Sequence, residues 1–219
     1  RIELGIARGA YNFEYERLLP GLDAWGAGQR MRELIPAVKA LWKGDYTHEG
    51  EFYSFPKTSS APLPLQKDGP PIWVAARDPN SHEFAVAQGC DVQVTPLWKG
   101  EEEITLLMDT FNAACEKFPD QPRPRIMLLL HTYVADSPDD VKQAAQELNR
   151  FYCYFGAWFM NKREITGGWI KPLTDAEIAA HPFYTPEAME RDLVIGEPAK
   201  VIERLRHYEA LGYDEYAFW

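Results

Sequence analysis

The sequence predicts an α/β fold in which parallel strands alternate with helices. Short apolar segments recur along the 219 residues, and most are followed by a helical stripe of apolar side chains. With 46% hydrophobic residues, the chain can also bury a sizeable core. Strands connected by helices pair in parallel through right-handed crossovers. The predicted strands cover residues 1–7, 72–76, 91–95, 126–134 and 213–219.

Five strands are too few to close an eight-stranded barrel. Because the first and last residues both fall within predicted strands, we interpret residues 1–219 as a single domain that forms part of a larger (β/α)8 barrel. A five-stranded open sheet is the alternative. The barrel interpretation predicts a longer natural protein, with about three further strands before this chain and a closing helix after it.

The helices are predicted from apolar side chains at helical spacing. They cover about residues 29–43, 84–88, 101–118, 138–159 and 198–211. Residues 9–28 are expected to form a polar and aromatic loop, which is typical of ligand-binding connections. Glu51–Phe55 suggests a short edge strand, and the prolines at 56, 62 and 64 predict no regular structure after it.

Residues 161–193 are predicted to form a long irregular insertion. Within it, Thr174 and Glu177 have the spacing of a capping box, and Thr185 followed by Pro186 indicates another short helix. Insertions of this length are usually functional.

The segment from Gly69 to Ala87 organises the predicted fold. A strand at Ile72–Ala76 is apolar throughout, as expected for a parallel strand that is covered on both faces. The turn Arg77–Ser81 follows it and begins a helix, so backbone N–H groups should be free there, at the positive end of the helix dipole. A phosphate group would bind at such a turn. The alternative is that Asn80 and Ser81 only cap the helix.

Composition excludes several classes of protein. A net charge of -10 without a basic run disfavours general binding to nucleic acids or anionic membranes, so any phosphate must be held by local arginines. Cys90, Cys115 and Cys153 are widely separated in apolar surroundings, and we expect them to be core residues in a reducing compartment. No run of 18 apolar residues or secretory leader is evident, which predicts a cytoplasmic protein.

Seven aromatic residues fall within residues 151–169. Those at 151, 155, 158 and 159 share one helical face and are predicted to pack in the core. Tyr154 and Trp169 lie off that face. Gly167 and Gly168 come just before Trp169 and give the backbone freedom to move.

Three motifs together carry a resemblance to a known family. They are Leu4–Tyr11, then Pro71–Ser81 with Ala85 and Gly89, then Val194–Pro198 before a helix. In this order and spacing the chain resembles the bacterial luciferase-like flavin-dependent monooxygenases over its whole length. The resemblance implies a TIM barrel with residues 1–7 as its fourth strand and residues 213–219 as its eighth.

The resemblance also implies a cofactor site. The residues that would hold the phosphate of FMN are Arg8, Ala10, Arg30, Arg77, Asp78 and Ser81. Arg77 and Asp78 depart from the acidic residue and serine that the luciferases have at these positions, and the Asp78 carboxylate would repel a phosphate dianion. The Asp78 backbone N–H would have to bind, with the carboxylate turned away or paired with Arg77.

The same resemblance places a substrate pocket and a lid over the barrel mouth. Trp98, Tyr154 and Trp169 are the residues implied, with Gly167–Pro172 as the lid that keeps water away from the flavin. Most catalytic residues of the family come from strands that precede this chain. His131 is the one inner-wall histidine among the predicted strands, although a histidine in a strand is commonly a core residue.

We therefore expect an oxidoreductase in which reduced FMN and oxygen act on a small apolar substrate. A flavin reductase would supply the reduced flavin, and the enzyme would be a homo-oligomer with neither nucleic acid nor membrane as partner. Alternatives are an F420-dependent oxidoreductase of the same fold and a flavin-binding partial barrel without turnover. A glycosidase ranks last, because it needs two facing carboxylates at strand ends. Among the predicted strands, only Asp136 comes close to such a position.

Overall fold

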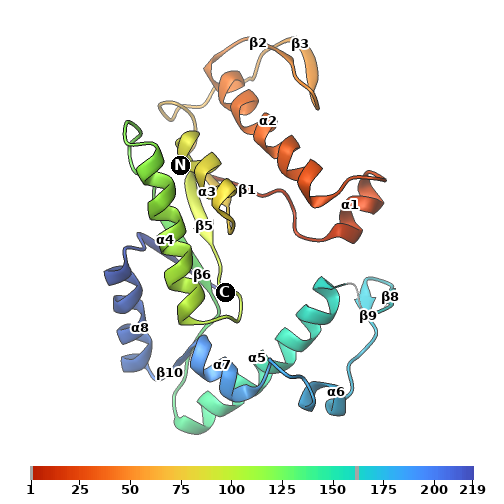
Figure 1. Ribbon diagram of the computed structural model, residues 1–219, viewed down its shortest axis with the longest axis vertical. Coiled ribbons are helices and arrows are strands. Elements are labelled where there is room, and N and C mark those ends of the chain that lie inside the picture. Colours follow the sequence, from red (N-terminus) through yellow and green to blue (C-terminus); the bar gives the residue numbers. More distant parts are fainter. Residues whose placement is uncertain (1, 161–162) are drawn as a thin grey trace. The chain divides into compact units, whose positions relative to one another are not determined.

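The computed structural model describes residues 2–160 and 163–219, which form two compact units (Figure 1). The first unit contains the residues up to Gln93 together with Ala113–Pro124, and the second contains Val94–Asn112 and Arg125–Trp219. The single domain expected over residues 1–219 stays a prediction.

The first unit is built on three parallel strands. β4 (Ile72–Ala75) pairs on one side with β1 (Leu4–Ile6) and on the other with β5 (Asp91–Val94). In this register Val74 lies between Ile6 and Val92. The first three residues of β4 are buried, as its apolar sequence predicts for a parallel strand that is covered on both faces. All three predicted strands are confirmed, except that Arg1 lies outside the described residues.

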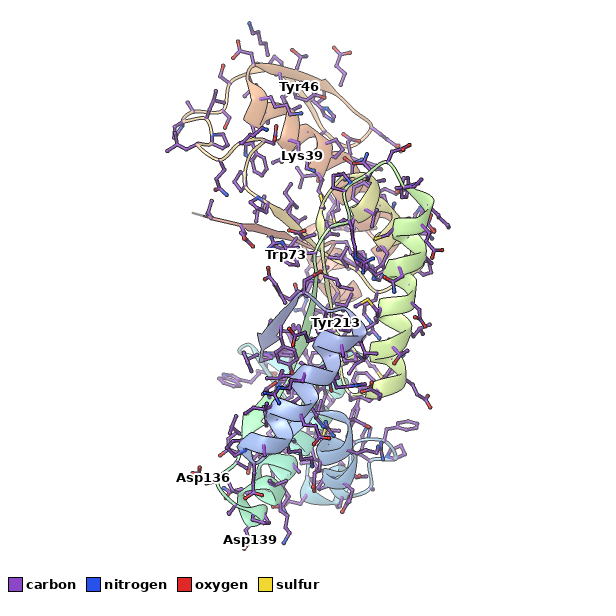
Figure 2. The ribbon with its side chains drawn as sticks, turned by 90° about the vertical axis from the view of Figure 1, so that its left-hand side faces the viewer. Lys39, Tyr46, Trp73, Asp136, Asp139 and Tyr213 are labelled. Carbon is purple, nitrogen blue, oxygen red and sulfur yellow. The ribbon has the colours of Figure 1, made fainter. Side chains whose placement is uncertain are left out.

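Three helices accompany these strands. They are α1 (Asn12–Leu18), α2 (Ala24–Lys43) and α3 (Pro79–Ala87). The loop expected over residues 9–28 is wrong, because it contains α1 and the start of α2. The Asp23 side chain accepts a hydrogen bond from Gly26 N at 2.7 Å and so caps α2. The helix therefore begins at Ala24, five residues before the start at residue 29 that the apolar stripe indicates. Lys39, labelled in Figure 2, donates from α2 to the carbonyl oxygen of Gln88 after α3.

A β-hairpin follows α2. β2 (Tyr46–Glu49) pairs antiparallel with β3 (Ser54–Thr58), so the expectation that no strand continues through Pro56 is wrong. Proline is tolerated in an edge strand that leaves its nitrogen side unpaired. Glu33 of α2 anchors the hairpin by accepting hydrogen bonds from Phe52 N at 3.0 Å and Tyr53 N at 2.8 Å. Partial burial would raise the Glu33 pKa, but these bonds and His48 lower it.

The second unit contains two pairs of parallel strands. β6 (Ile126–Leu130) pairs with β11 (Glu215–Phe218), and β7 (Thr132–Val134) pairs with β10 (Val194–Gly196). The single strand predicted over residues 126–134 is therefore divided at His131. The reason is a change of partner, since Val194 N donates to the His131 carbonyl oxygen at 3.1 Å where β10 begins.

Five helices belong wholly or mainly to this unit. They are α4 (Glu101–Lys117), α5 (Pro138–Phe159), α6 (Asp175–Ala179), α7 (Pro186–Asp192) and α8 (Pro198–Leu211). The long helices and both predicted short helices are confirmed. Ser137 caps α5, and the capping box of Thr174 and Glu177 begins α6. α8 ends at Gly212, whose φ of 109° is readily adopted by glycine.

The buried face of α5 differs from the prediction. Its buried side chains are Val141, Ala145, Asn149, Tyr152 and Cys153. Phe151 and Phe159 are 39% and 41% exposed, so the core face predicted at 151, 155, 158 and 159 is wrong at 151 and 159, and the other two residues are half-buried. The true stripe includes a polar residue, because Asn149 donates a hydrogen bond to the carbonyl oxygen of Tyr184. A pattern of apolar side chains alone does not reveal that pairing.

The insertion contains a small hairpin. β8 (Ile165–Thr166) pairs antiparallel with β9 (Trp169–Ile170) across Gly167 and Gly168. Both glycines have positive φ, as the tight turn requires. The start of the predicted insertion, residues 161–162, lies outside the described residues.

The cysteines agree largely with the prediction. Cys90 and Cys153 are buried, and Cys115 is half-buried. Burial raises the pKa of all three thiols. In the described part of the chain, no helix is both long enough and apolar enough to cross a membrane.

The apolar stripe of α4 provides a test of the core. Phe111 is fully buried, whereas Leu106 on the same helix is 58% exposed. Phe111→Ala is expected to lower the free energy of unfolding by about 3 to 5 kcal/mol, because it leaves a cavity. Leu106→Ala is the matched control and should change it by less than about 0.5 kcal/mol. Urea denaturation measures both, and equal effects would contradict this packing.

Candidate functional site

A cavity of about 260 Å³ in the first unit collects several residues that the sequence singled out. It is formed where β1 ends, along one face of α2 and at the start of α3. Its lining residues are Arg8, Ala24, Trp25, Gly28, Gln29, Met31, Arg32, Asp78, Asn80 and Ser81. Arg8, Asp78 and Ser81, which the resemblance implied for one phosphate site, therefore line the same cavity.

Arg8 is held against α2. Its guanidinium Nη1 donates to the carbonyl oxygen of Ala24 at 3.2 Å. The Arg8 side chain passes beside Gly28, where a Cβ would lie 3.8 Å from Arg8 Cδ, an ordinary van der Waals contact. Since a guanidinium carries five N–H donors, Arg8 retains donors for an anion.

Arg32 is the cavity residue that sequence reasoning missed. Its Nη2 donates to the carbonyl oxygen of Asn80 at 3.2 Å, and its guanidinium carbon lies 4.9 Å from the ring centroid of Phe84. Ala24, Gly28 and Arg32 are four residues apart, so they share one face of α2. That spacing was a signal in the sequence that could have identified Arg32.

Arg30 points elsewhere. Residues two apart on a helix face in nearly opposite directions, and the Arg30 guanidinium carbon lies 4.9 Å from the ring centroid of Phe52. Its Nε is buried with no hydrogen-bond partner in the described part of the chain. Arg30 therefore does not line the cavity. Ala10 and Arg77 are also absent from its lining, although each lies in the connection that leads to it.

The start of α3 is capped by Asp78. Its carboxylate accepts hydrogen bonds from Ser81 N at 3.1 Å and from Ser81 Oγ at 2.6 Å. Partial burial tends to raise the Asp78 pKa, but the Ser81 bonds and the Arg32 charge outweigh it and hold the pKa below the usual 3.8. The Asp78 carboxylate is directed at Ser81, and Asp78 is the residue that caps α3, where the sequence suggested Asn80 and Ser81 as caps.

The cavity has the chemistry of an anion site. Arg8 and Arg32 bring two fixed positive charges, and the start of α3 adds N–H groups at the positive end of a helix dipole. Asp78 brings one negative charge, so the three charged side chains sum to one positive charge. A phosphate monoester fits these donors better than a neutral ligand does.

The residues predicted for substrate binding and the lid lie in the second unit. The Trp98 ring packs edge-on against Tyr184, with 5.0 Å between centroids. The Tyr154 hydroxyl accepts a hydrogen bond from Leu173 N at 3.1 Å and so fastens the insertion to α5. Trp169 is 82% exposed at the tip of the β8–β9 hairpin, which excludes a core role for its side chain.

His131 lies among aromatic rings. It stacks on Trp219 with 4.2 Å between centroids, and Phe151 and Tyr152 meet it edge-on. Burial lowers the pKa of His131, and a hydrogen bond to the Trp219 backbone opposes this. The side chain borders a second cavity of about 290 Å³. A catalytic role for it stays a prediction.

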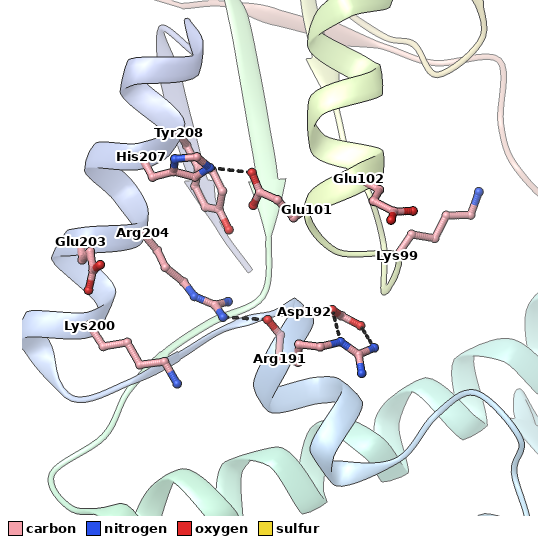
Figure 3. A pocket seen from close by; sticks show the side chains of 10 residues that line it. All are labelled: Lys99, Glu101, Glu102, Arg191, Asp192, Lys200, Glu203, Arg204, His207 and Tyr208. Atoms are coloured by element: carbon pink, nitrogen blue, oxygen red, sulfur yellow. Dashed lines mark hydrogen bonds and ion pairs between the residues drawn. The ribbon is translucent and has the colours of Figure 1, made fainter.

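A larger cleft of about 710 Å³ lies between α8, the end of α7 and the start of α4 (Figure 3). Its charges are engaged with one another. His207 Nε2 lies 2.5 Å from Glu101 Oε1, and Arg191 makes two hydrogen bonds to Asp192. Arg204 donates to the carbonyl oxygens of Leu193 and Arg191. The contacts of His207 and Arg204 link α8 to α4 and to the end of α7, whereas Arg191 and Asp192 are neighbours on α7.

No group of three or more potential metal ligands gathers within residues 2–160 and 163–219.

Comparison with known proteins identifies the class. The family described as luciferase-like monooxygenase matches residues 1–215, and the chain belongs to this family. Its fold is therefore that of the luciferase-like TIM barrel, of which the parallel strands form a part. The predicted fold class and family are confirmed.

Two relatives of the chain differ widely in their similarity to it. The chain is 69% identical over 219 residues to the oxygenase component of a flavin-dependent trigonelline monooxygenase from Acinetobacter baylyi. An F420-dependent glucose-6-phosphate dehydrogenase from Beutenbergia cavernae is 26% identical over 220 residues. All of the chain is covered in both comparisons, but it spans only 61% and 62% of the lengths of these relatives.

Solved structures show the same fold. The oxygenating constituent of 3,6-diketocamphane monooxygenase from Pseudomonas putida, in complex with FMN, matches with a TM-score of 0.65 and 17% identity. That match covers 99% of this chain and 63% of the other. An F420-dependent secondary alcohol dehydrogenase matches with a TM-score of 0.73 and 12% identity, covering 100% and 63%.

The Asp78 cap can be tested through stability. Asp78→Ala is expected to lower the free energy of unfolding by about 0.5 to 2 kcal/mol, the usual contribution of a helix cap. Because the folded-state pKa is lowered, this contribution is complete above 3.8, the usual aspartate value, and is lost as the pH falls through the folded-state pKa. Asp78→Asn keeps a capping oxygen and serves as control. Urea denaturation at several pH values would contradict the assignment if the alanine variant lost no stability at neutral pH.

Proposed function

We propose that the whole protein is a flavin-dependent monooxygenase that uses reduced FMN and oxygen. The observation that carries this proposal is the cavity of Arg8, Arg32 and the start of α3, in a chain 69% identical to the oxygenase component of such an enzyme. When bound, reduced flavin supplies the electrons that activate oxygen, so that one oxygen atom is transferred to the substrate. The protein provides binding, orientation and exclusion of water.

The residues present fit the phosphate end of FMN. Arg8 and Arg32 would each donate charge-assisted hydrogen bonds to it, and the Ser81 hydroxyl would join them only by leaving the Asp78 carboxylate to which it now donates. Arg32 takes the role that the resemblance gave to Arg30. Both arginines already donate to backbone carbonyls, which keeps their side chains at the cavity before a ligand arrives.

F420 is the alternative cofactor, because a 26% identical relative uses it. Two arginines in a cavity of about 260 Å³ favour a compact terminal phosphate such as that of FMN. The much higher identity to a flavin-dependent enzyme supports the same choice. We retain F420 as an outcome that ligand titration would reveal.

For the substrate, we propose a small molecule similar to trigonelline, on which the 69% identical relative acts. Trigonelline is a zwitterion with an aromatic ring, so this proposal replaces the apolar substrate expected from the sequence. The relative is an oxygenase component, which supports a separate flavin reductase as partner. A cytoplasmic homo-oligomer stays a prediction.

The β8–β9 hairpin is proposed as the lid. Arg163 fastens its base by donating to the carbonyl oxygens of Lys171 at 2.8 Å and Pro172 at 2.6 Å. Arg163 also pairs with Glu177, whose pKa is lowered to about 2 by the Thr174 backbone bond and by Arg163. The base is therefore fixed, whereas the tip at Gly167, Gly168 and Trp169 is exposed. Such an arrangement suits a hinged cover that excludes water.

The phosphate site is tested by ligand titration. Arg8→Ala and Arg32→Ala are each expected to weaken FMN binding by about 1.5 to 3 kcal/mol, the contribution of a hydrogen bond to a charged group. Riboflavin, which lacks the phosphate, should bind these variants as it binds the unaltered chain. The quantity measured is the ratio of FMN to riboflavin affinity, by quenching of flavin fluorescence.

Arg30→Ala is the matched control for this titration. It removes the same charge from the opposite side of α2 and should leave the affinity ratio unchanged. An unchanged ratio in both Arg8→Ala and Arg32→Ala would rule out the site. A lower ratio of FMN to riboflavin affinity in Arg30→Ala alone would restore Arg30 as the phosphate ligand. Tighter binding of F420 than of FMN would establish the alternative cofactor.

Trp169 tests the lid in the full-length enzyme. Trp169→Ala should change the free energy of unfolding by less than about 0.5 kcal/mol, because the side chain is 82% exposed. It should raise the KM for the substrate or increase the release of hydrogen peroxide per substrate molecule consumed. Phe183→Ala removes another exposed aromatic from the second unit and is the control. Kinetics unchanged in the Trp169 variant would end the lid assignment.

A further inference from the structure

Tyr15 is buried in a helix that is otherwise largely exposed. Its side chain belongs to α1 and is only 6% exposed, whereas Leu18 of the same helix is 85% exposed. The Tyr15 hydroxyl is inaccessible to solvent and has no hydrogen-bond partner in the described part of the chain. A buried hydroxyl without a partner is unfavourable, so its retention calls for an explanation.

The Tyr15 ring lies on the connection between β1 and α1. A Cβ built on Gly9 would lie 2.8 Å from Tyr15 Cε1 and 3.2 Å from its hydroxyl oxygen. Gly9 has φ of 89°, so glycine suits both the backbone and the close approach of the ring. The hydroxyl is therefore fixed beside the residue that follows Arg8.

The two side chains also interact electrostatically. Burial raises the pKa of Tyr15, and the Arg8 guanidinium opposes that rise. Tyr15 therefore remains a neutral phenol at neutral pH, and its oxygen can accept a hydrogen bond from a guanidinium. Tyr15 is not among the residues that line the cavity, whereas Arg8 is.

We propose that Tyr15 is a positioning residue: when a phosphate is bound, the Tyr15 hydroxyl, which has no partner among the described residues, accepts a hydrogen bond from Arg8 and holds the guanidinium toward that phosphate. This inference rests on the proposed function, because it concerns the same phosphate site. Arg8 is then held from two sides, by the carbonyl oxygen of Ala24 and by the phenol oxygen. Tyr15 acts through Arg8 and makes no contact of its own with the phosphate.

Tyr15→Phe removes the hydroxyl and keeps the ring that packs on Gly9. We expect this variant to bind FMN about 3- to 10-fold more weakly, the usual range for one net hydrogen bond. Its affinity for riboflavin and its Tm should not fall. In an Arg8→Ala background, Tyr15→Phe should have no further effect on FMN binding, because its hydrogen-bond donor is gone. Tyr46→Phe is the control, since that hydroxyl contacts His48 in the β2–β3 hairpin.

The outcomes separate this inference from the proposed function. If Arg8→Ala weakens FMN binding and Tyr15→Phe does not, the inference is overturned and the phosphate site stands. If the two losses add in the double variant, Tyr15 acts independently and the inference is likewise overturned. Equal losses for FMN and riboflavin, or a lower Tm, would indicate a structural role and reject it. Unchanged FMN affinity in both Arg8→Ala and Arg32→Ala would overturn the proposed site itself.

Discussion

The hydrogen bonds of the Asp78 carboxylate to Ser81 are the constraint on which the candidate site depends. They start α3 immediately after β4, and so fix where the helix dipole and the Asn80 carbonyl lie. Arg32 reaches that carbonyl, which ties α2 to the start of α3. The same bonds oppose anion binding, since the carboxylate occupies the Ser81 hydroxyl and adds a negative charge. Stability of the turn and affinity for phosphate are therefore in competition at one residue.

Most of the fold was predictable because its signals are local. Short segments of the sequence indicate where strands and helices alternate. One example is Ser137 and Pro138, which cap and begin α5. Where the prediction failed, either the contact that decides the structure joins residues far apart in the sequence, or the element has no capping residue to indicate it. α1 has no side-chain cap, and the buried face of α5 depends on Asn149, whose partner is the carbonyl of Tyr184, 35 residues away. Neither feature follows from apolar spacing.

The site was predictable to the extent that parallel strands end at one edge. Arg8, Asp78 and Ser81 follow β1 and β4, so their meeting is a consequence of topology. The arginine on α2 that lines the cavity is Arg32, whereas the resemblance implied Arg30, and the difference is one of helical phase. The spacing of Ala24, Gly28 and Arg32 indicates that phase, and the tertiary packing of Arg30 against Phe52 and of Arg32 against Phe84 agrees with it.

An anion site on a chain with a net charge of -10 must be strong locally, because the overall field repels its ligand. The structure meets this requirement by fixing its cations before binding. Arg8 and Arg32 are each bonded to a backbone carbonyl, so little side-chain entropy remains to be lost when phosphate binds. The large charged cleft of the second unit differs, since Arg191 is bonded twice to the Asp192 carboxylate and His207 contacts the Glu101 carboxylate. A cationic side chain that is paired with a carboxylate joins parts of the structure. An arginine that is fixed in position but keeps unused N–H donors can bind a phosphate.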